Sequence, residues 1–192
     1  MPVSINGNTG VITGLSVGGL PDGTVDADSL ASNAVTAGKL ASGVGGKILQ
    51  VVTTSTSTQS STQSTSFSDN GLSLAITPSA TSSKVLVMVN VGVQSYANTY
   101  NAGCALKILR DSTTIHTPFL TNEVYGFYHA SSNTANMYAR YPLTVLDSPN
   151  TTSSITYKTQ HAALSTSHTT LSQPGGSGGT STSYITLMEV GA

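Results

Sequence analysis

Charged side chains are scarce in this 192-residue chain: they make up 8% of its residues, and the formal net charge is −1. A surface so poor in lysine and arginine cannot neutralise a phosphate backbone or hold an anionic bilayer. Nucleic acid and membranes are therefore not expected partners. The chain also has one cysteine, Cys104, so no disulfide can form within one chain. A lone cysteine in an apolar stretch is usually a small buried hydrophobe.

Long apolar runs are missing as well. No stretch approaches the roughly 20 apolar residues that a bilayer-spanning helix needs. Residues 1–7 have neither a basic start nor an apolar run, so they do not resemble a secretory signal. We therefore expect the chain to be made in a cytoplasm and to reach any location outside it as part of something larger.

Groups that do chemistry are few and dispersed. The chain lacks the short motifs of common hydrolases, nucleotide-binding loops and zinc sites. Asp111 and Asp147 lie in turn sequences, where aspartate caps its own backbone. No two histidines have the spacing of a shared metal site: His116, His129, His161 and His168. The sequence predicts no catalytic residue, no cofactor and no metal, save where a threefold axis would triplicate one histidine, and we expect no enzyme.

The composition changes after residue 46. Residues 1–46 are rich in Gly, Ala, Asp and Ser and contain no aromatic residue, so this segment cannot build a core by itself. Residues 47–192 carry apolar runs separated by turn residues. The sequence thus predicts two parts: an N-terminal segment, 1–46, and one folded domain, 47–192.

A ten-residue repeat lies inside the N-terminal segment. Residues 24–33 and 34–43 share Val, Ala, Leu, Ala and Ser in register. Two copies are too few for a solenoid that stands alone, but identical copies from other chains could supply the missing neighbours. The apolar positions would then face a common axis as a trimer interface: Val25, Leu30, Val35 and Leu40. A flexible linker with one or two helical turns explains the same residues equally well.

The part from residue 47 onward has the alternating pattern of strands. Turn residues, such as Arg110-Asp111-Ser112-Thr113, separate the runs about every ten residues. The Ser/Thr/Gln-rich tract 53–66 is expected to be strand only at its ends. No helical periodicity competes here. The result is a predicted all-β fold, an antiparallel β-sandwich with strands at 48–52, 71–76, 84–93, 104–110, 113–116, 137–146, 154–160 and 183–190.

One predicted strand, 84–93, is apolar on both faces. Its alternate valines line one face, and Leu86 and Met88 make the other face apolar too. An antiparallel strand of a lone sandwich normally shows water a polar face. We therefore expect another subunit to cover this face, with Leu86 and Met88 in the trimer interface.

Aromatic residues gather in stretches expected to be loops. Tyrosine and its neighbours on a rigid scaffold provide contact area and hydrogen bonds for a sugar or protein receptor at low entropic cost. The same residues could instead close one end of the sandwich or pack against a neighbouring subunit. The receptor-contact candidates are Tyr96, Tyr100, Tyr125, Phe127, Tyr128 and His129.

Several stretches carry a resemblance to a known family. Residues 4–15 read Ser-Ile-Asn-Gly-Asn-Thr-Gly-Val-Ile-Thr-Gly-Leu, followed by Val-Asp-Ala-Asp-Ser-Leu-Ala at 25–31 and Ala-Val-Thr-Ala-Gly-Lys-Leu-Ala at 34–41. Residues 76–87 read Ile-Thr-Pro-Ser-Ala-Thr-Ser-Ser-Lys-Val-Leu-Val, and 184–190 read Tyr-Ile-Thr-Leu-Met-Glu-Val. This text resembles the fibre and appendage proteins of tailed bacteriophages, notably marine ones.

The resemblance implies a homotrimeric virion protein. Its N-terminal segments would attach to other virion proteins, and its jelly-roll-like heads, arranged as in tumour-necrosis-factor-like trimers, would point outward. The chain departs from a typical fibre in having almost no shaft, so a tail fibre, a head fibre and a capsid decoration protein all fit.

Three functions follow from the sequence. The first is a virion appendage whose head binds a host surface glycan or protein. The second is a capsid decoration, or cement, protein that stabilises the particle without binding a host. The third, a polysaccharide-cleaving enzyme, is disfavoured because such enzymes need paired carboxylates in a groove, and this chain has few carboxylates.

Overall fold

The computed structural model describes residues 4–6, 11–13, 30–32, 34–35, 39, 47–97, 101–117, 125–128, 135–176 and 179–191. The chain divides into two compact units, Met1–Gly45 and Gly46–Ala192. This division falls next to the boundary predicted after residue 46. In the part of the chain that is described, no helix is long and apolar enough to cross a membrane.

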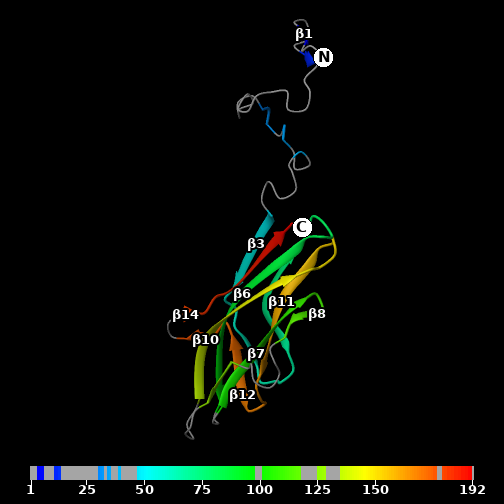
Figure 1. The fold of residues 1–192 in the computed structure, drawn as a ribbon. Coiled ribbons are helices and arrows are strands. Elements are labelled where there is room, and N and C mark those ends of the chain that lie inside the picture. Colours follow the sequence, from blue (N-terminus) through cyan, green and yellow to red (C-terminus); the bar gives the residue numbers. More distant parts are fainter. Residues whose placement is uncertain are drawn as a thin grey trace. The chain divides into compact units, whose positions relative to one another are not determined.

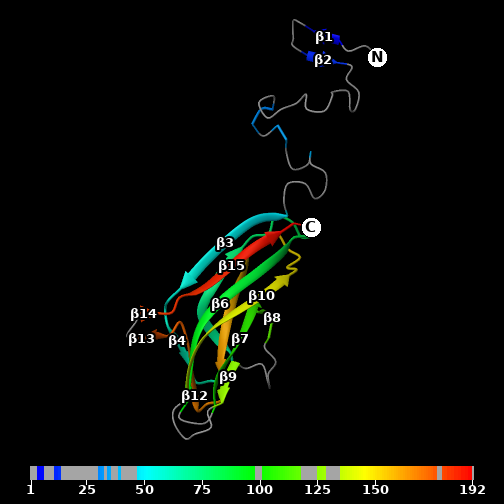
Figure 2. The ribbon, with the colours of Figure 1, turned by 60° about the vertical axis from the view of Figure 1, so that its left-hand side comes forward.

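The N-terminal unit contains a pair of short strands, labelled in Figure 2. β1 (Ser4–Asn6) pairs antiparallel with β2 (Val11–Thr13). Two of the four predicted interface residues of the repeat are described, Leu30 and Val35, and both side chains are exposed. Val25 and Leu40 lie outside the described residues. Exposed apolar side chains in a single chain are what packing between chains requires, and that packing stays a prediction.

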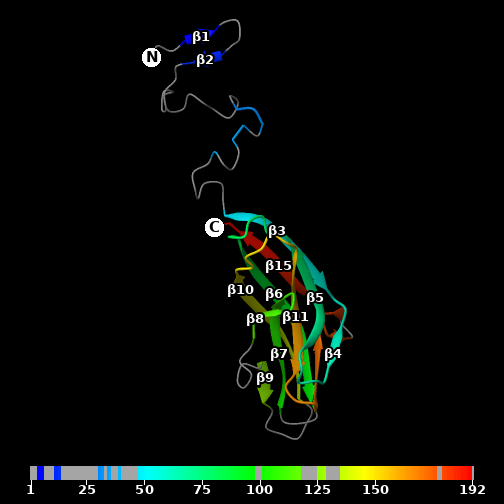
Figure 3. The same ribbon diagram turned by 90° about the vertical axis from the view of Figure 1, so that its right-hand side faces the viewer.

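The unit Gly46–Ala192 consists of antiparallel strands in two main sheets, seen from three sides in Figures 1 to 3. Sheet I has six strands: β3 (Ile48–Thr56), β15 (Ser183–Val190), β6 (Lys84–Ala97), β12 (His168–Ser172), β4 (Ser60–Thr62) and β10 (Ala135–Asp147). Sheet II has five: β5 (Ser68–Ile76), β11 (Ile155–Ala163), β7 (Asn101–Arg110), β8 (Thr113–His116) and β9 (Tyr125–Tyr128). A separate two-stranded ladder joins β13 (Gly175–Gly176) to β14 (Gly179–Thr180).

The strand pairs are nested along the chain. β3 pairs with β15 and β6 with β10 in sheet I, while β5 pairs with β11 and β7 with β8 in sheet II. Nested pairs of this kind are compatible with a jelly roll, which stays a prediction. The all-β antiparallel sandwich predicted from the sequence is confirmed.

The core lies between the two sheets and follows the period-2 pattern of the strands. On β6 the alternate valines from Val85 to Val93 are each at most 3% exposed. Ile185 and Leu187 of β15 extend this surface, and Leu72, Ile108 and Tyr157 meet it from sheet II. Each such side chain contributes about 1.5–3 kcal/mol when buried, so the core dominates the stability of the sandwich.

The structure departs from the predicted strands mainly where polar residues are buried. β12 was not among the predicted strands; its Thr170 and Ser172 are polar, yet both are fully buried and β12 pairs with β6 and β4. In the tract 53–66, β3 runs on to Thr56 and β4 lies in the middle. The predicted hairpin at 110–113 is confirmed: β7 ends at Arg110, Asp111 has a φ of 53°, and β8 follows.

Gly92 marks the point where two strands share one edge of β6. β15 pairs with residues 84–90 of β6 and β12 with residues 93–97. Between them, the amide of Gly92 donates to Ser183 Oγ at 3.0 Å, and its carbonyl accepts from Gln173 N at 2.9 Å. A Cβ at Gly92 would collide with the side chain of Ser181, so a larger residue fits here only if Ser181 shifts.

Candidate functional site

The two ends of the sandwich differ in what they carry. The domain begins and finishes at one end, because Val190 pairs with Ile48 and the amide of Gly191 donates to Lys47 O at 2.7 Å. β6 also starts at this end, since Lys84 lies opposite Val190. β6 has 14 residues, and a strand of that length spans roughly 45 Å. The other end of β6, where β9 and β12 also lie in Figure 2, is therefore far from the residues at which the domain begins. We call it the far end of the domain.

The predicted receptor residues that are described lie at this far end. Tyr96 is the next-to-last residue of β6 and is 37% exposed. Strand β9, which contains Tyr125, Phe127 and Tyr128, pairs with the first residues of β7. Tyr100 and His129 lie outside the described residues.

The prediction that the aromatic residues lie in loops is wrong for Tyr96, Tyr125, Phe127 and Tyr128. β6 continues past the valine run because residues up to Ala97 find partners on both β10 and β12. β9 forms because it adds to the edge of β7. The ends of strands, and not loops, therefore bring these aromatic residues to one end of the domain. Their role in receptor binding stays a prediction.

An apolar row crosses the outer face of sheet I. Met188 of β15 lies opposite both Val51 of β3 and Leu86 of β6, and Leu86 lies opposite Leu146 of β10. Val51 and Leu146 are each 53% exposed, and Leu86 and Met188 are half-buried. Four strands thus place apolar side chains side by side on a surface that faces solvent in the single chain.

The rows on one side of it are neutral, whereas the next row on the other side includes Lys84, opposite Val190. Met88 lies between Thr186 and Thr144, and Tyr184, 49% exposed, lies opposite Asn90. A second cation on this face, Arg140 of β10, lies 5.8 Å from the centre of the Tyr184 ring. Its guanidinium donates to Asn90 Oδ1 at 3.0 Å, Ser181 Oγ at 3.2 Å and Thr182 O at 2.6 Å. The arginine is therefore held by its own chain.

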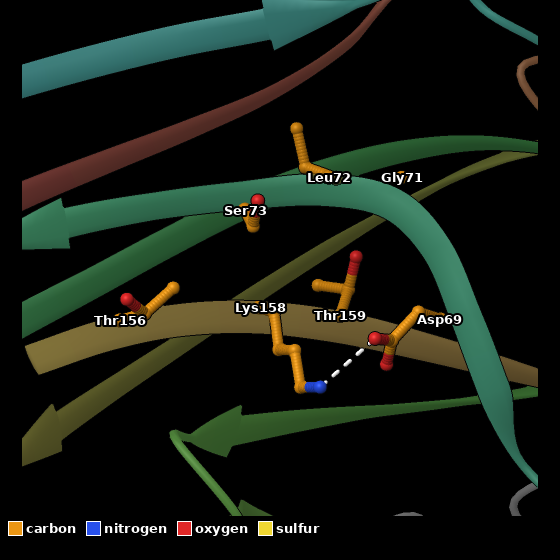
Figure 4. Close-up of a pocket in the computed structure, with 7 residues that line it drawn as sticks. All are labelled: Asp69, Gly71, Leu72, Ser73, Thr156, Lys158 and Thr159. Carbon is orange, nitrogen blue, oxygen red and sulfur yellow. Dashed lines mark hydrogen bonds and ion pairs between the residues drawn. The ribbon is translucent and has the colours of Figure 1, made fainter.

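The outer face of sheet II carries a pocket beside a bulge in β5. Ser73 lies opposite Lys158 of β11 and Asp69 opposite Gln160, so three residues of β5 face Thr159 alone. In the bulge Gly71 has a φ of +86°, a conformation that favours glycine. The pocket has a volume of about 170 Å³, and the residues lining it appear in Figure 4: Asp69, Gly71, Leu72, Ser73, Thr156, Lys158 and Thr159.

Asn70 fixes the bulge from inside. Its side chain is fully buried, and its Oδ1 accepts from Thr159 Oγ1 at 2.7 Å and from the amide of Leu72 at 3.2 Å. Burying an amide is costly unless its hydrogen bonds are made. These bonds hold the bulge in one shape, so the pocket outside it is part of the folded structure.

The rim of the pocket is a charged pair. Asp69 Oδ2 lies 2.9 Å from Lys158 Nζ, drawn as a dashed line in Figure 4, and Asp69 Oδ1 accepts from Gln160 Nε2 at 2.6 Å. The hydrogen bond from Lys158 is the main cause that lowers the pKa of Asp69, so the carboxylate is ionised at neutral pH. No feature of the sequence pointed to this site, because the bulge brings together residues about ninety positions apart.

A serine–histidine pair lies inside the sandwich. Ser172 Oγ is 2.8 Å from His161 Nδ1, and both residues are fully buried. Burial lowers the pKa of His161 to about 4, so the imidazole is neutral. The second ring nitrogen meets Ser60 Oγ at 3.4 Å, where a triad would have a carboxylate. The geometry is that of a hydrogen-bonded core contact.

The two aspartates of the predicted turn sequences have structural partners. Asp147 accepts from Arg110 Nη1 and from Tyr157 Oη, each at 2.7 Å, and Asp111 Oδ1 accepts from the amide of Thr156 at 2.9 Å. Among the residues that the structure describes, no group of three or more His, Cys, Asp or Glu side chains could hold a metal ion.

No protein-family model matches the chain, and no curated protein sequence matches it. Among solved structures, it is similar to the crystal structure of the infectious bursal disease virus VP2 subviral particle, with a TM-score of 0.35 and 14% sequence identity. The match covers 74% of this chain and 37% of that chain, so this chain spans well under half the length of its neighbour. A likeness at this level carries no argument about function, which therefore rests on the chain's own geometry.

Proposed function

We propose that this chain is a structural protein of a tailed-phage virion, a homotrimeric fibre or appendage without enzymatic activity. Residues 1–46 attach it to other virion proteins and help it trimerise. Residues 47–192 form a head whose far end, with Tyr96 and strand β9, contacts the host surface.

The observation that carries the proposal is the apolar row of Val51, Met188, Leu86 and Leu146. Large exposed apolar patches on soluble proteins mark interaction surfaces. In the described part of the chain, no strand pairs with the outer edges of β3 and β10, and proteins usually cover such edges. Subunit packing would remove both the row and the edges from water.

A second copy of the chain suits this face better than a charged partner. Close to a symmetry axis identical residues approach one another, so like charges would repel there. The apolar row and the Thr53–Thr186–Met88–Thr144 row beside it carry no charge. The resemblance to phage fibre proteins supports three as the number of copies.

The proposal is tested on particles of the phage that encodes the chain. Quantitative mass spectrometry of purified virions should find the chain in a copy number divisible by three, and virions without it should adsorb more slowly to host cells. Normal adsorption together with greater loss of particles on heating would replace the appendage by the cement function. Absence of the chain from purified virions would contradict both.

A further inference from the structure

The polar groups at the β5 bulge present a donor and an acceptor side by side. Lys158 Nζ and Asp69 Oδ2 are 2.9 Å apart. An ammonium has three protons, of which this bond uses one, and each carboxylate oxygen can accept more than one hydrogen bond. The carboxylate can accept a hydrogen bond from one hydroxyl group, and the ammonium can donate one to the oxygen of the neighbouring hydroxyl.

The remaining lining of the pocket suits the rest of a sugar ring. Ser73 and Thr156 add hydroxyl groups for further hydrogen bonds. A volume of about 170 Å³ is small compared with the roughly 300–1,000 Å³ of pockets for drug-sized ligands, so one ring fits and a longer oligosaccharide does not.

We propose that this pocket binds one pyranose ring through two neighbouring hydroxyl groups, which Asp69 and Lys158 engage as acceptor and donor. The inference rests on the proposed function and deepens it, because it makes a host surface glycan the ligand of the head. It places this contact on the outer face of sheet II, apart from the aromatic residues at the far end.

The charges of the site argue against a metal ion as the ligand. Lys158 and Lys107 both act on Asp69, so two cations stand against one carboxylate and a divalent cation gains no net attraction. A neutral, hydroxyl-rich ligand exploits both groups at once. The pocket also lies on the sheet opposite the apolar row, so it stays open to solvent when copies pack through sheet I.

Saturation-transfer NMR on the full-length chain tests the site with three probes: the methyl glycosides of glucose, galactose and mannose at millimolar concentration. At least one should receive saturation at its ring protons. Asp69→Ala removes the charged acceptor and should weaken binding about tenfold, as expected for a hydrogen bond to a charged group. Ser73→Trp should abolish binding by filling the pocket while leaving the ion pair intact.

Lys84→Ala, which removes a charge at the exposed start of β6, is the control and should bind like the wild type. If Asp69→Ala does not fold, the saturation transfer measured with Ser73→Trp alone tests the proposal. No transfer to any of the three glycosides, or transfer that survives both substitutions, overturns the proposal. If the protein is a trimer but binds no sugar, the sugar site is wrong and the proposed virion role stands. If it binds sugar as a monomer, the site stands and the proposed trimer is wrong.

Discussion

Leu86 and Met188 lie directly opposite each other on the neighbouring strands β6 and β15, with both side chains on the outer face of sheet I. Their sequence neighbours Val85, Val87 and Leu187 point inward and are fully buried. Two adjacent strands are thus apolar on both faces. The inner face builds the core, and the outer face is free to bind another subunit.

Leu86→Glu tests that division of roles. A charge in the middle of the apolar row should destabilise the subunit interface by about 2 kcal/mol or more per subunit, the size of an interface hot spot. The head should stay folded, because the side chain lies outside the core. Sedimentation velocity should show loss of the trimer, while circular dichroism stays unchanged. Ala75→Glu, on the exposed face of sheet II, is the matched control and should keep the trimer.

Glu189 should make the head sensitive to acid. Burial alone raises the pKa of this carboxyl, but hydrogen bonds from Ser79 and Gln50 outweigh it and lower the pKa to about 2. Because the unfolded value is 4.5, this stabilisation is complete above pH 4.5 and is lost as the pH falls towards 2. Glu189→Gln should cost about 2–3 kcal/mol at pH 7 in urea unfolding. A cost that is equally large at pH 2 would contradict this account.

Protonation of His161 should destabilise the domain at a higher pH than protonation of Glu189 does. Burial lowers its pKa from 6.5 to about 4, so the unfolded chain takes up this proton more readily than the folded chain. The stability that depends on neutral His161 is fully present above pH 6.5. Between pH 6.5 and 4, the free energy of unfolding falls by up to about 1.4 kcal/mol per pH unit. His161→Asn, which can still bond to Ser172, should flatten unfolding curves in this range. His116→Asn on β8 is the control and should leave the pH dependence in place.

Gly92→Ala should destabilise the junction between β12 and β15. The new Cβ would collide with Ser181, and overpacking of this kind costs about 1–3 kcal/mol. Ser181→Gly in the same chain should recover most of the loss, because it removes the atoms in the way. A double-mutant cycle by thermal unfolding measures this coupling, and two additive losses would show that the contact is not the cause.

The sequence predicted features that depend on local pattern. Alternating valines gave β6, and Asp111 in a turn sequence gave the hairpin after β7. Strand β12 was missed because its buried Thr170 and Ser172 are polar, and only their partners, such as Gly103 and His161, make burial tolerable. The pocket at Asp69 was missed because Lys158 reaches it through pairing of distant strands. Leu86 and Met88 predicted an apolar outer face, but Val51 and Leu146 joined it only through the strand order.

Light scattering on the purified full-length chain, alongside residues 46–192, tests the central claim most directly. The account predicts a mass about three times the 19.5 kDa of one chain for the full-length protein, and a trimer for the head alone, because the apolar row lies on the head. A full-length trimer whose head is monomeric would move the interface to Leu30 and Val35 of the N-terminal repeat. A monomer in both samples at micromolar concentration would contradict the account.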